Sequence, residues 1–147
     1  MKNAVLAALL CLMFLFSACT AAAPTAPVSE IYASIESAGL LPEMVTLNDD
    51  YIQSYYAIDL SGAQEYVFSI AADAARADTV ILMRVKGDKK AVVDALTLIL
   101  NQKLAEMENY IPEQYQIVKK SAVVENGDLV SLVISPDRDA IYDIINK

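Results

Sequence analysis

Alternating and helical spacings of apolar residues divide most of this chain into strands and helices. Period-two alternation over residues 65–71 and 79–86 predicts two half-buried strands. The connection between them, residues 72–78, is too long for a tight hairpin. A continuous apolar stripe at helical spacing follows Asp88 and predicts a long helix that ends near Tyr110.

A β-hairpin and a helix are predicted for the C-terminal part. Asn126-Gly127 separates two β-rich runs and is typical of a two-residue type I′ turn. Ser135-Pro136-Asp137 supplies a cap, a proline at the first position and an acid, which favour a helix start. The strand pairs expected from the turn are Val123 with Val130 and Val124 with Leu129.

Shorter elements are predicted before the first strand and after the long helix. Residues 28–38 read as a helix capped by Ser29, and residues 49–56 as a second helix capped by Asn48. Residues 44–47 form a short extended segment, and residues 112–115 a short turn of helix. This order predicts an α+β domain with a four-stranded antiparallel sheet, a long helix across one face and shorter terminal helices.

An uncharged apolar run from Ala4 to Phe16 begins the chain. It follows Lys2 and ends in Ser17-Ala18-Cys19, which is the pattern of a secretory signal and is too short for a comfortable membrane span. The ending resembles the lipobox of bacterial lipoproteins, although Phe16 stands where leucine is usual. The resemblance implies that Cys19 is lipidated and becomes the first residue of the mature chain.

The domain organisation follows from this signal. We expect a lipoprotein signal peptide over residues 1–18, an Ala/Pro/Thr linker with lipidated Cys19 over residues 19–28, and one domain over residues 29–147. The protein would lie on the extracytoplasmic face of the cell membrane, held through the lipid on Cys19. Two alternatives are ordinary secretion, cut after Ala18 or in the later Ala-rich segment, and an uncleaved N-terminal helix.

Composition removes several classes of function. The chain has no histidine, and its two cysteines are Cys11 in the signal and Cys19, so the domain lacks sulfur ligands and the commonest general base. Because Lys2 is the only charged residue in the signal, the mature chain carries a net charge of −9. This acidity argues against nucleic acid as a partner. We expect no cofactor and no metal.

Four short segments and the lipobox carry a resemblance to a known family. The segments are Leu41-Pro42-Glu43-Met44, Tyr55-Tyr56-Ala57-Ile58-Asp59, Ala77-Asp78-Thr79-Val80-Ile81 and Tyr110-Ile111-Pro112-Glu113-Gln114-Tyr115. With them the mature domain resembles the family named domain of unknown function 4358, small lipoproteins of Clostridia-like Gram-positive bacteria. The resemblance runs from Ile35 onward and implies a cell-surface lipoprotein, with no established activity or catalytic residues. The family usually has glutamate where Asp78 stands.

One candidate ligand or partner surface combines a charged connection with one face of the sheet. Asp73, Arg76 and Asp78 could bind a cation or, through the arginine, an anion; the alternative is a solvated loop with one surface ion pair. The sheet face that carries Leu82 and Arg84 is mixed in character. Either a terminal helix covers it, or partial exposure near Arg84 makes it a docking surface with the charged connection at its rim.

Other polar groups carry weaker hypotheses. The acid pairs Asp49-Asp50 and Asp137-Asp139 lie in predicted first helical turns, where capping explains them. A serine–lysine dyad with Lys119 or Lys120 is possible in principle, but no motif positions one. Tyrosines could line a carbohydrate or peptide groove, or be half-buried with wet hydroxyls. They are Tyr32, Tyr51, Tyr55, Tyr56, Tyr110 and Tyr115.

Three functional hypotheses remain from the sequence. The first is a non-enzymatic binding or accessory domain for a cell-envelope or protein partner. The second is a histidine-free hydrolase or transferase that acts on envelope material through carboxylates, which would need two converging carboxylates in a cleft. The third, a solute-binding lipoprotein, is disfavoured because such proteins usually hold ligand between two domains.

Overall fold

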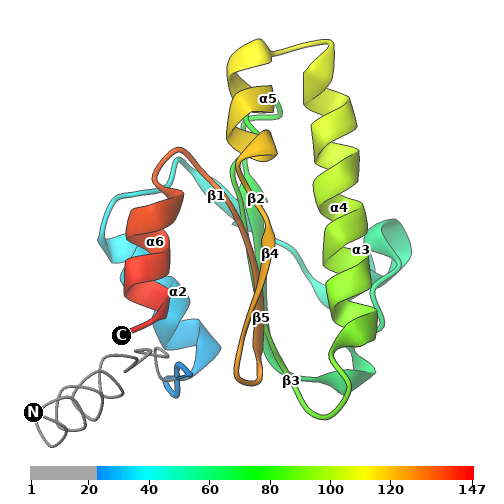
Figure 1. Ribbon diagram of the computed structural model, residues 1–147, viewed down its shortest axis with the longest axis vertical. Helices are drawn as coiled ribbons and strands as arrows, with labels where there is room; N and C mark the ends of the chain where they lie inside the picture. The colour runs from blue at the N-terminus through cyan, green and yellow to red at the C-terminus, as the bar shows by residue number, and fades with distance from the viewer. Residues whose placement is uncertain (1–22) are drawn as a thin grey trace, which may run out of the picture.

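A five-stranded antiparallel sheet separates two layers of helices in the computed structural model, which describes residues 23–147 (Figure 1). One layer holds α2 and α6, and the other holds α3, α4 and α5. The predicted signal peptide and Cys19 lie outside the described residues. The strands are β1 (Met44–Thr46), β2 (Ala63–Ala71), β3 (Thr79–Val85), β4 (Val123–Asn126) and β5 (Leu129–Ile134), in the order β1-β2-β3-β5-β4. The helices are α2 (Val28–Ser37), α3 (Asp49–Tyr56), the 3₁₀ turn η2 (Leu60–Gly62), α4 (Lys90–Glu108), α5 (Pro112–Lys119) and α6 (Arg138–Ile145).

The α+β class with an antiparallel sheet is confirmed, but the predicted count of four strands is wrong. Residues 44–46, expected only as an extended segment, pair with β2 at the sheet edge, with Met44 opposite Ala71 and Thr46 opposite Ser69. A strand of three residues is too short for alternation to distinguish it from a loop.

The hairpin forms, but its turn and register differ from the prediction. The two turn residues are Gly127 and Asp128, so Asn126 pairs with Leu129 and Val123 with Leu132. Gly127 has φ +61°, whereas Ala57 is the only non-glycine residue with positive φ in the described chain. Positive φ at the first turn position alone fits a type II′ turn and not type I′. The predicted pairs are therefore displaced by two residues.

Helix ends show where distant residues replace local caps. Asn48 caps α3 as predicted, accepting a hydrogen bond from the backbone N–H of Tyr51 at 2.9 Å. Ser29 does not cap α2; instead Glu65 on β2 accepts a hydrogen bond from the N–H of Val28 at 2.7 Å. A carboxylate at this helix end is also favoured by the helix dipole. Val28, expected at the end of the linker, is therefore part of the packed domain.

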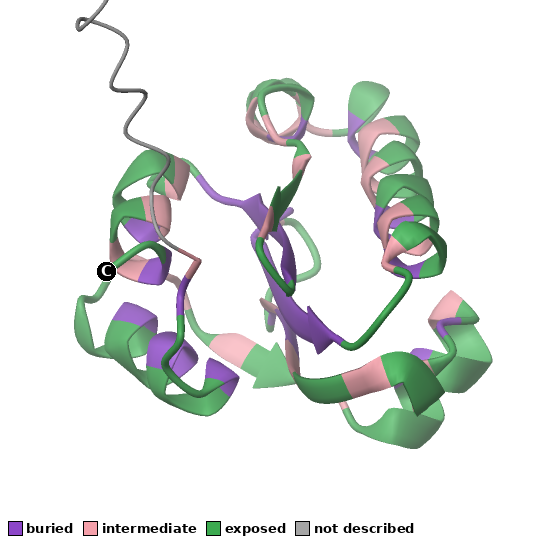
Figure 2. Cartoon of the chain, turned by 60° about the horizontal axis from the view of Figure 1, so that its bottom comes forward, coloured by how far each residue is buried: buried purple, intermediate pink, exposed green. Residues whose placement is uncertain are grey.

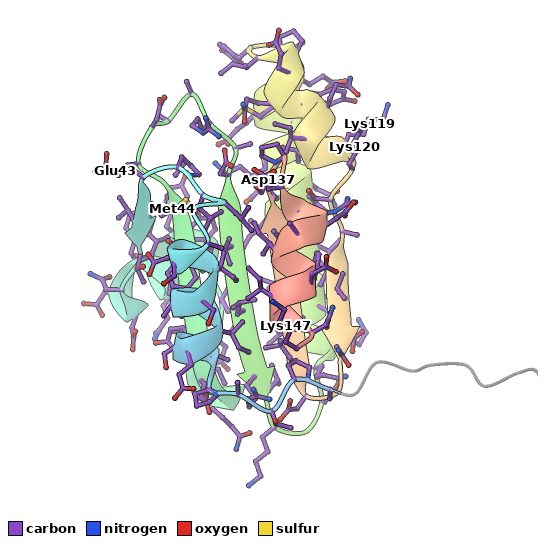
Figure 3. All side chains as sticks on the ribbon, turned by 90° about the vertical axis from the view of Figure 1, so that its left-hand side faces the viewer. Glu43, Met44, Lys119, Lys120, Asp137 and Lys147 are labelled. Carbon is purple, nitrogen blue, oxygen red and sulfur yellow. The ribbon has the colours of Figure 1, made fainter. Side chains whose placement is uncertain are left out.

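Two hydrophobic cores lie on opposite faces of the sheet, and β3 is buried along its whole length between them (Figure 2). On one face Phe68, Ile81 and Met83 pack against the apolar stripe of α4, as predicted. On the other, α2 and α6 lie over the sheet (Figure 3). Leu82 is fully buried there and Arg84 is 8% exposed. The terminal helices thus cover this face, which was the first of the two alternatives drawn from the sequence, and the alternative of partial exposure near Arg84 is wrong.

Candidate functional site

A groove of about 520 Å³ opens between α3, α4, the β2–β3 connection and the α4–α5 turn. We call it the tyrosine groove, because Tyr51, Tyr55, Tyr56 and Tyr110 line it. Its charged lining residues are Arg76, Asp78, Lys103 and Glu106. Cavities of this volume are in the range that binds small molecules. The groove is therefore the first candidate for a ligand site in the described chain.

Aromatic rings form one wall of the groove. Tyr51 and Tyr55 stack with ring centroids 5.2 Å apart, and Tyr56 lies edge-on to Tyr55 at 4.9 Å. Phe68 supports the cluster from the core, 4.7 Å from the ring of Tyr56. Tyr55 is 65% exposed and Tyr110, at the other side, is 84% exposed. Tyrosine rings this exposed are available to stack against a ligand.

The hydroxyl of Tyr56 stays protonated over the whole physiological range. Burial raises its pKa to about 12, and the neighbouring Tyr51, Tyr55 and Glu106 act in the same direction. The neutral phenol can donate and accept a hydrogen bond. Tyr56 thus adds a hydroxyl that can both donate and accept a hydrogen bond to this aromatic wall.

An ion pair between a buried aspartate and a partly exposed arginine lines the groove. The Nε of Arg76 donates to Oδ2 of Asp78 at 2.9 Å, and the Asp78 side chain is 1% exposed while that of Arg76 is 38% exposed. This contact raises the pKa of Arg76. Oδ1 of Asp78 is buried and accepts no hydrogen bond from any described residue. An unpaired buried carboxylate oxygen is expensive, so it marks a place where a donor is missing.

Distant segments hold this ion pair in place. The amide of Gln114, on α5, accepts a hydrogen bond from the backbone N–H of Ala77 at 2.8 Å. The backbone N–H of Ala71 donates to the carbonyl of Asp78 at 2.9 Å, which closes the β2–β3 connection. Asp78 therefore sits on a rigid support and not on a free loop.

A second ion pair lies on the α4 wall. The ammonium of Lys103 contacts Glu106 at 3.2 Å, one helical turn away. Both carboxylates that line the groove are therefore engaged with a cation. The charges of the four ionised side chains cancel.

The predicted surface of Asp73, Arg76, Asp78, Leu82 and Arg84 is divided by the structure. Arg76 and Asp78 lie in the tyrosine groove. Asp73 is exposed and accepts a hydrogen bond from the N–H of Ala75 at 2.9 Å, which stabilises the connection. Leu82 and Arg84 face the other core, away from the groove.

Arg84 holds the start of the described chain against the sheet. Its guanidinium donates to the carbonyls of Pro24 at 3.1 Å and Ala26 at 2.7 Å, and to Asp128 at 2.5 Å. Glu65 lies 4.0 Å from its Nε. We call this arrangement of Arg84 with Pro24, Ala26 and Asp128 the Arg84 clasp. Arginine suits it because its planar fork carries five donors.

A larger cavity, of about 660 Å³, lies beside the clasp between α2, the end of α6 and residues 24–26. Small side chains such as Ala33, Ser34 and Ala38 line it, and no aromatic ring does. Its wall includes the segment that leads toward Cys19. This cavity therefore lies where the N-terminal segment packs on the domain, and its small side chains offer little for ligand recognition.

The structure brings neither the acid pairs nor a serine and a lysine into a catalytic arrangement within the described residues. Asp49 accepts a hydrogen bond from the hydroxyl of Tyr66, and Asp139 pairs with Arg138 at 2.7 Å. Within residues 23–147 no three potential ligand residues cluster as a metal site would need. Ser121 donates to the carbonyl of Ile117, and the ammonium of Lys119 lies 5.8 Å from the ring centroid of Tyr115. Lys119 and Lys120 lie on the end of α5 (Figure 3).

Sequence reasoning named most groove residues without placing them together. It offered six tyrosines for a groove, of which Tyr51, Tyr55, Tyr56 and Tyr110 line it. Tyr115 is not among the lining residues, and Tyr32 is buried on the other face of the sheet, where its hydroxyl donates to Ser69 at 2.7 Å. The sequence did not connect the groove tyrosines with Lys103 or Glu106 on α4. One signal was available. Three of the four segments that carry the family resemblance supply lining residues, through Tyr55-Tyr56, Asp78 and Tyr110-Ile111.

Comparison with known proteins identifies a family and no activity. No curated protein and no solved structure matches the chain. None of the described helices is both long enough and apolar enough to span a membrane. A family model, described as a domain of unknown function (DUF4358), matches residues 36–135 and covers the sheet and the tyrosine groove. Because the match covers well over half of its length, this chain belongs to the DUF4358 family.

Proposed function

We propose that this protein is a binding domain tethered to the extracytoplasmic face of the cell membrane by a lipid on Cys19. Its ligand is a component of the cell envelope, and the tyrosine groove is the binding site. The groove carries the proposal, because it combines exposed aromatic rings with a buried polar atom that lacks a partner. The buried oxygen is unfavourable without a donor, and the exposed rings offer apolar surface that a ligand can cover.

The position of the groove supports a tethered role. Arg84 lies toward one end of β3, and Asp78 directly precedes the other end. The five steps from Thr79 to Arg84 span about 17 Å of extended strand. The chain enters the domain at the Arg84 clasp, and the groove lies near the opposite end of the strand, on the side of the α4–α5 connection in Figure 1.

The length of the tether strengthens this point. Five residue steps separate Cys19 from Pro24, which the clasp holds, and they reach at most about 18 Å. A lipid on Cys19 would therefore keep the clasp end of the domain near the membrane. The groove would then face outward, toward the envelope.

The state of the carboxylates favours binding over catalysis. A carboxylate-based hydrolase needs one carboxyl group free to give or take a proton. Asp78 is paired with Arg76 and Glu106 with Lys103, so each is already engaged. We therefore propose an accessory or binding role without enzymatic activity.

The lipid anchor is tested first, in a bacterial host that processes lipoproteins. Intact-mass analysis of the membrane fraction should give a mature chain that begins at an acylated Cys19. The Cys19→Ala variant should remain unprocessed or leave the membrane fraction. Any other mature N-terminus of the wild-type chain in the membrane contradicts the anchor.

Binding is tested with membrane vesicles that carry the full chain. Labelled cell-wall fragments from the source cells should be captured by vesicles with the wild-type chain. The Tyr55→Ala/Tyr110→Ala double variant removes the two exposed rings and should lose capture. Leu98→Ala, which removes an exposed apolar side chain on α4 outside the groove, is the matched control and should keep it. Equal capture by all three proteins contradicts the proposed site.

A further inference from the structure

We infer that the ligand of the tyrosine groove is a neutral saccharide, a step that rests on the proposed function and deepens it. The sugar ring would lie against Tyr55 and Tyr110, and its hydroxyls would bind the Arg76–Asp78 pair. Four features of the groove lead to this ligand class: its charge balance, its unpaired donors and acceptor, its exposed rings and its volume.

The charge balance of the groove excludes a strongly charged ligand. Arg76 is compensated by Asp78 at 2.9 Å and Lys103 by Glu106 at 3.2 Å, so the lining carries no net charge. The mature chain has a net charge of −9, which repels anions at longer range. A cation would need a carboxylate that is not already paired. A neutral ligand is not repelled by the net charge and needs no unpaired carboxylate.

The polar groups of the ion pair are arranged for hydroxyls. Among the described residues, the guanidinium of Arg76 makes one hydrogen bond, through Nε, which leaves the two Nη groups as donors. Oδ1 of Asp78 is an acceptor without a donor. A hydroxyl group both donates and accepts, so neighbouring hydroxyls of a sugar satisfy both residues at once. Because Oδ1 is buried, the groups that cover it must move aside before a hydroxyl can reach it.

The exposed rings match the other face of a sugar. A pyranose ring presents C–H groups on its faces, which pack on aromatic rings, while its hydroxyls point outward. Tyr55 and Tyr110 offer the two most exposed rings of the groove, at 65% and 84%. Tyr56 adds a hydroxyl that stays neutral because its pKa is raised to about 12 by burial. The volume of about 520 Å³ admits a short saccharide and no folded partner.

A peptide ligand fits these observations less well. Peptides in extended form usually bind by adding a strand to a sheet edge. The edge strands are β1 and β4, and neither lines the groove. A peptide terminus would also bring a full charge into a lining that is already neutral. A sugar needs neither a free strand edge nor a charge partner.

Tyrosine fluorescence of the full chain tests the ligand class directly. The chain has no tryptophan, and four of its eight tyrosines line the groove, so their emission reports on binding there. The full chain is held in a polyoxyethylene detergent, because the heads of maltoside detergents are themselves sugars. The probes are the β-1,4-linked tetramers of N-acetylglucosamine and of glucose. Tri-alanine, a zwitterionic peptide, is the comparison.

We expect at least one neutral tetramer to give a saturable change below millimolar concentration. Tyr55→Ala and Tyr110→Ala should each weaken this binding at least tenfold, because ring stacking is lost. Asp78→Asn keeps the shape of the side chain, leaves Arg76 an acceptor, and should also weaken it. Leu98→Ala should bind as the wild type does. Fluorescence changes are confirmed by calorimetry, so that a variant lacking one reporter ring is still measured.

Two results would overturn the saccharide assignment. One is the absence of saturable binding of both tetramers; the other is binding that Tyr55→Ala and Tyr110→Ala leave unchanged. Binding of tri-alanine with loss in these variants would place a peptide in the groove instead. Failure of the proposed function is a separate result. In that case the vesicles capture no cell-wall fragments, whereas a wrong ligand class leaves their capture intact and merely insensitive to added tetramer.

Discussion

An arginine paired with an aspartate lies near each end of β3: Arg84 with Asp128 at one end, and Arg76 with Asp78 just before the other. The two pairs differ in which hydrogen-bonding groups they leave without a partner. Arg84 is 8% exposed and donates to Pro24, Ala26 and Asp128. Arg76 is 38% exposed by its side chain and makes one hydrogen bond, to Asp78. At the Arg84 end, the arginine is hydrogen-bonded to the start of the described chain and to Asp128. At the Arg76 end, the Nη donors of the arginine and one oxygen of Asp78 have no hydrogen-bond partner among the described residues.

This difference separates a structural ion pair from a candidate ligand site. A buried arginine whose donors are matched by carbonyls and a carboxylate needs nothing further. A buried aspartate with an orphan oxygen needs a donor that the described chain does not supply. The same two residue types thus have opposite roles, and the roles follow from their hydrogen-bond partners.

The largest expected effect tests whether the Arg84 end is core. Leu82→Asp places a charge at a fully buried position between α2, α6 and the sheet, so the free energy of unfolding should fall by more than about 4 kcal/mol. The measurement is urea unfolding followed by circular dichroism. Val124→Asp, at an exposed valine on edge strand β4, is the control and should cost less than about 1 kcal/mol. A Leu82→Asp protein of normal stability would show that the sheet face under α2 and α6 is not core, and it would again be a candidate docking surface.

Removal of the clasp should have the next largest effect. Arg84→Met leaves the carbonyls of Pro24 and Ala26 without their donor, which should lower the free energy of unfolding by about 2–3 kcal/mol. The Thr25–Ala26 bond, the one bond of this segment that does not involve a proline, should then become cleavable by a protease of broad specificity such as proteinase K, with the site mapped by mass spectrometry. Lys90→Met breaks an exposed pair with Asp94 and is the control, which should leave the free energy of unfolding nearly unchanged because the solvent screens that pair. Equal resistance of the Arg84→Met protein and the wild type at the Thr25–Ala26 bond would show that other contacts hold the segment.

Long elements of this fold could be predicted from the sequence, and short or shared ones could not. The period of β2, β3 and α4 repeats over enough residues to be read directly. β1 has three residues, and its strand character depends on pairing with β2. The turn shifted to Gly127-Asp128 because Asn126 stays in its strand, where its side chain donates to Asn146 at 2.9 Å. Such contacts involve residues far apart in the chain.

The candidate site illustrates the same limit. The tyrosines and the charged connection were separate hypotheses, because α3, residues 71–78 and the end of α4 are distant in sequence. Arg76 and Arg84 could not be ranked, since both stand near acidic residues and only tertiary contacts assign their partners. Cys19 lies outside the described residues, so its lipidation stays a prediction.

High pH should lower the free energy of unfolding, because Tyr56 in the groove loses its proton. Burial raises the pKa of Tyr56 to about 12 from the ordinary 10.0, so between these values the folded state binds more protons than the unfolded state. Stability is therefore fully present below about pH 10 and falls as the pH rises toward 12. Tyr56→Phe removes its share, so its urea midpoint should fall less steeply than that of the wild type. Below about pH 9 the two midpoints should differ by a constant amount, and parallel curves up to pH 12 would contradict this assignment.

The smallest expected effect is that of a chelator, which tests whether a metal ion binds the unpartnered oxygen of Asp78. EDTA should leave the melting temperature of the full chain in detergent unchanged, because Asp78 is already neutralised by Arg76 and no cluster of three potential ligand residues lies within residues 23–147. Calcium usually needs six to eight oxygen ligands, which one free carboxylate oxygen cannot supply. A melting temperature that falls with EDTA and recovers with calcium, but does neither in Asp78→Asn, would place a cation at this oxygen. The groove would then be completed by a metal, and the contrast between the two ends of β3 would be one of ligand type: backbone carbonyls at the closed end and an ion at the open one.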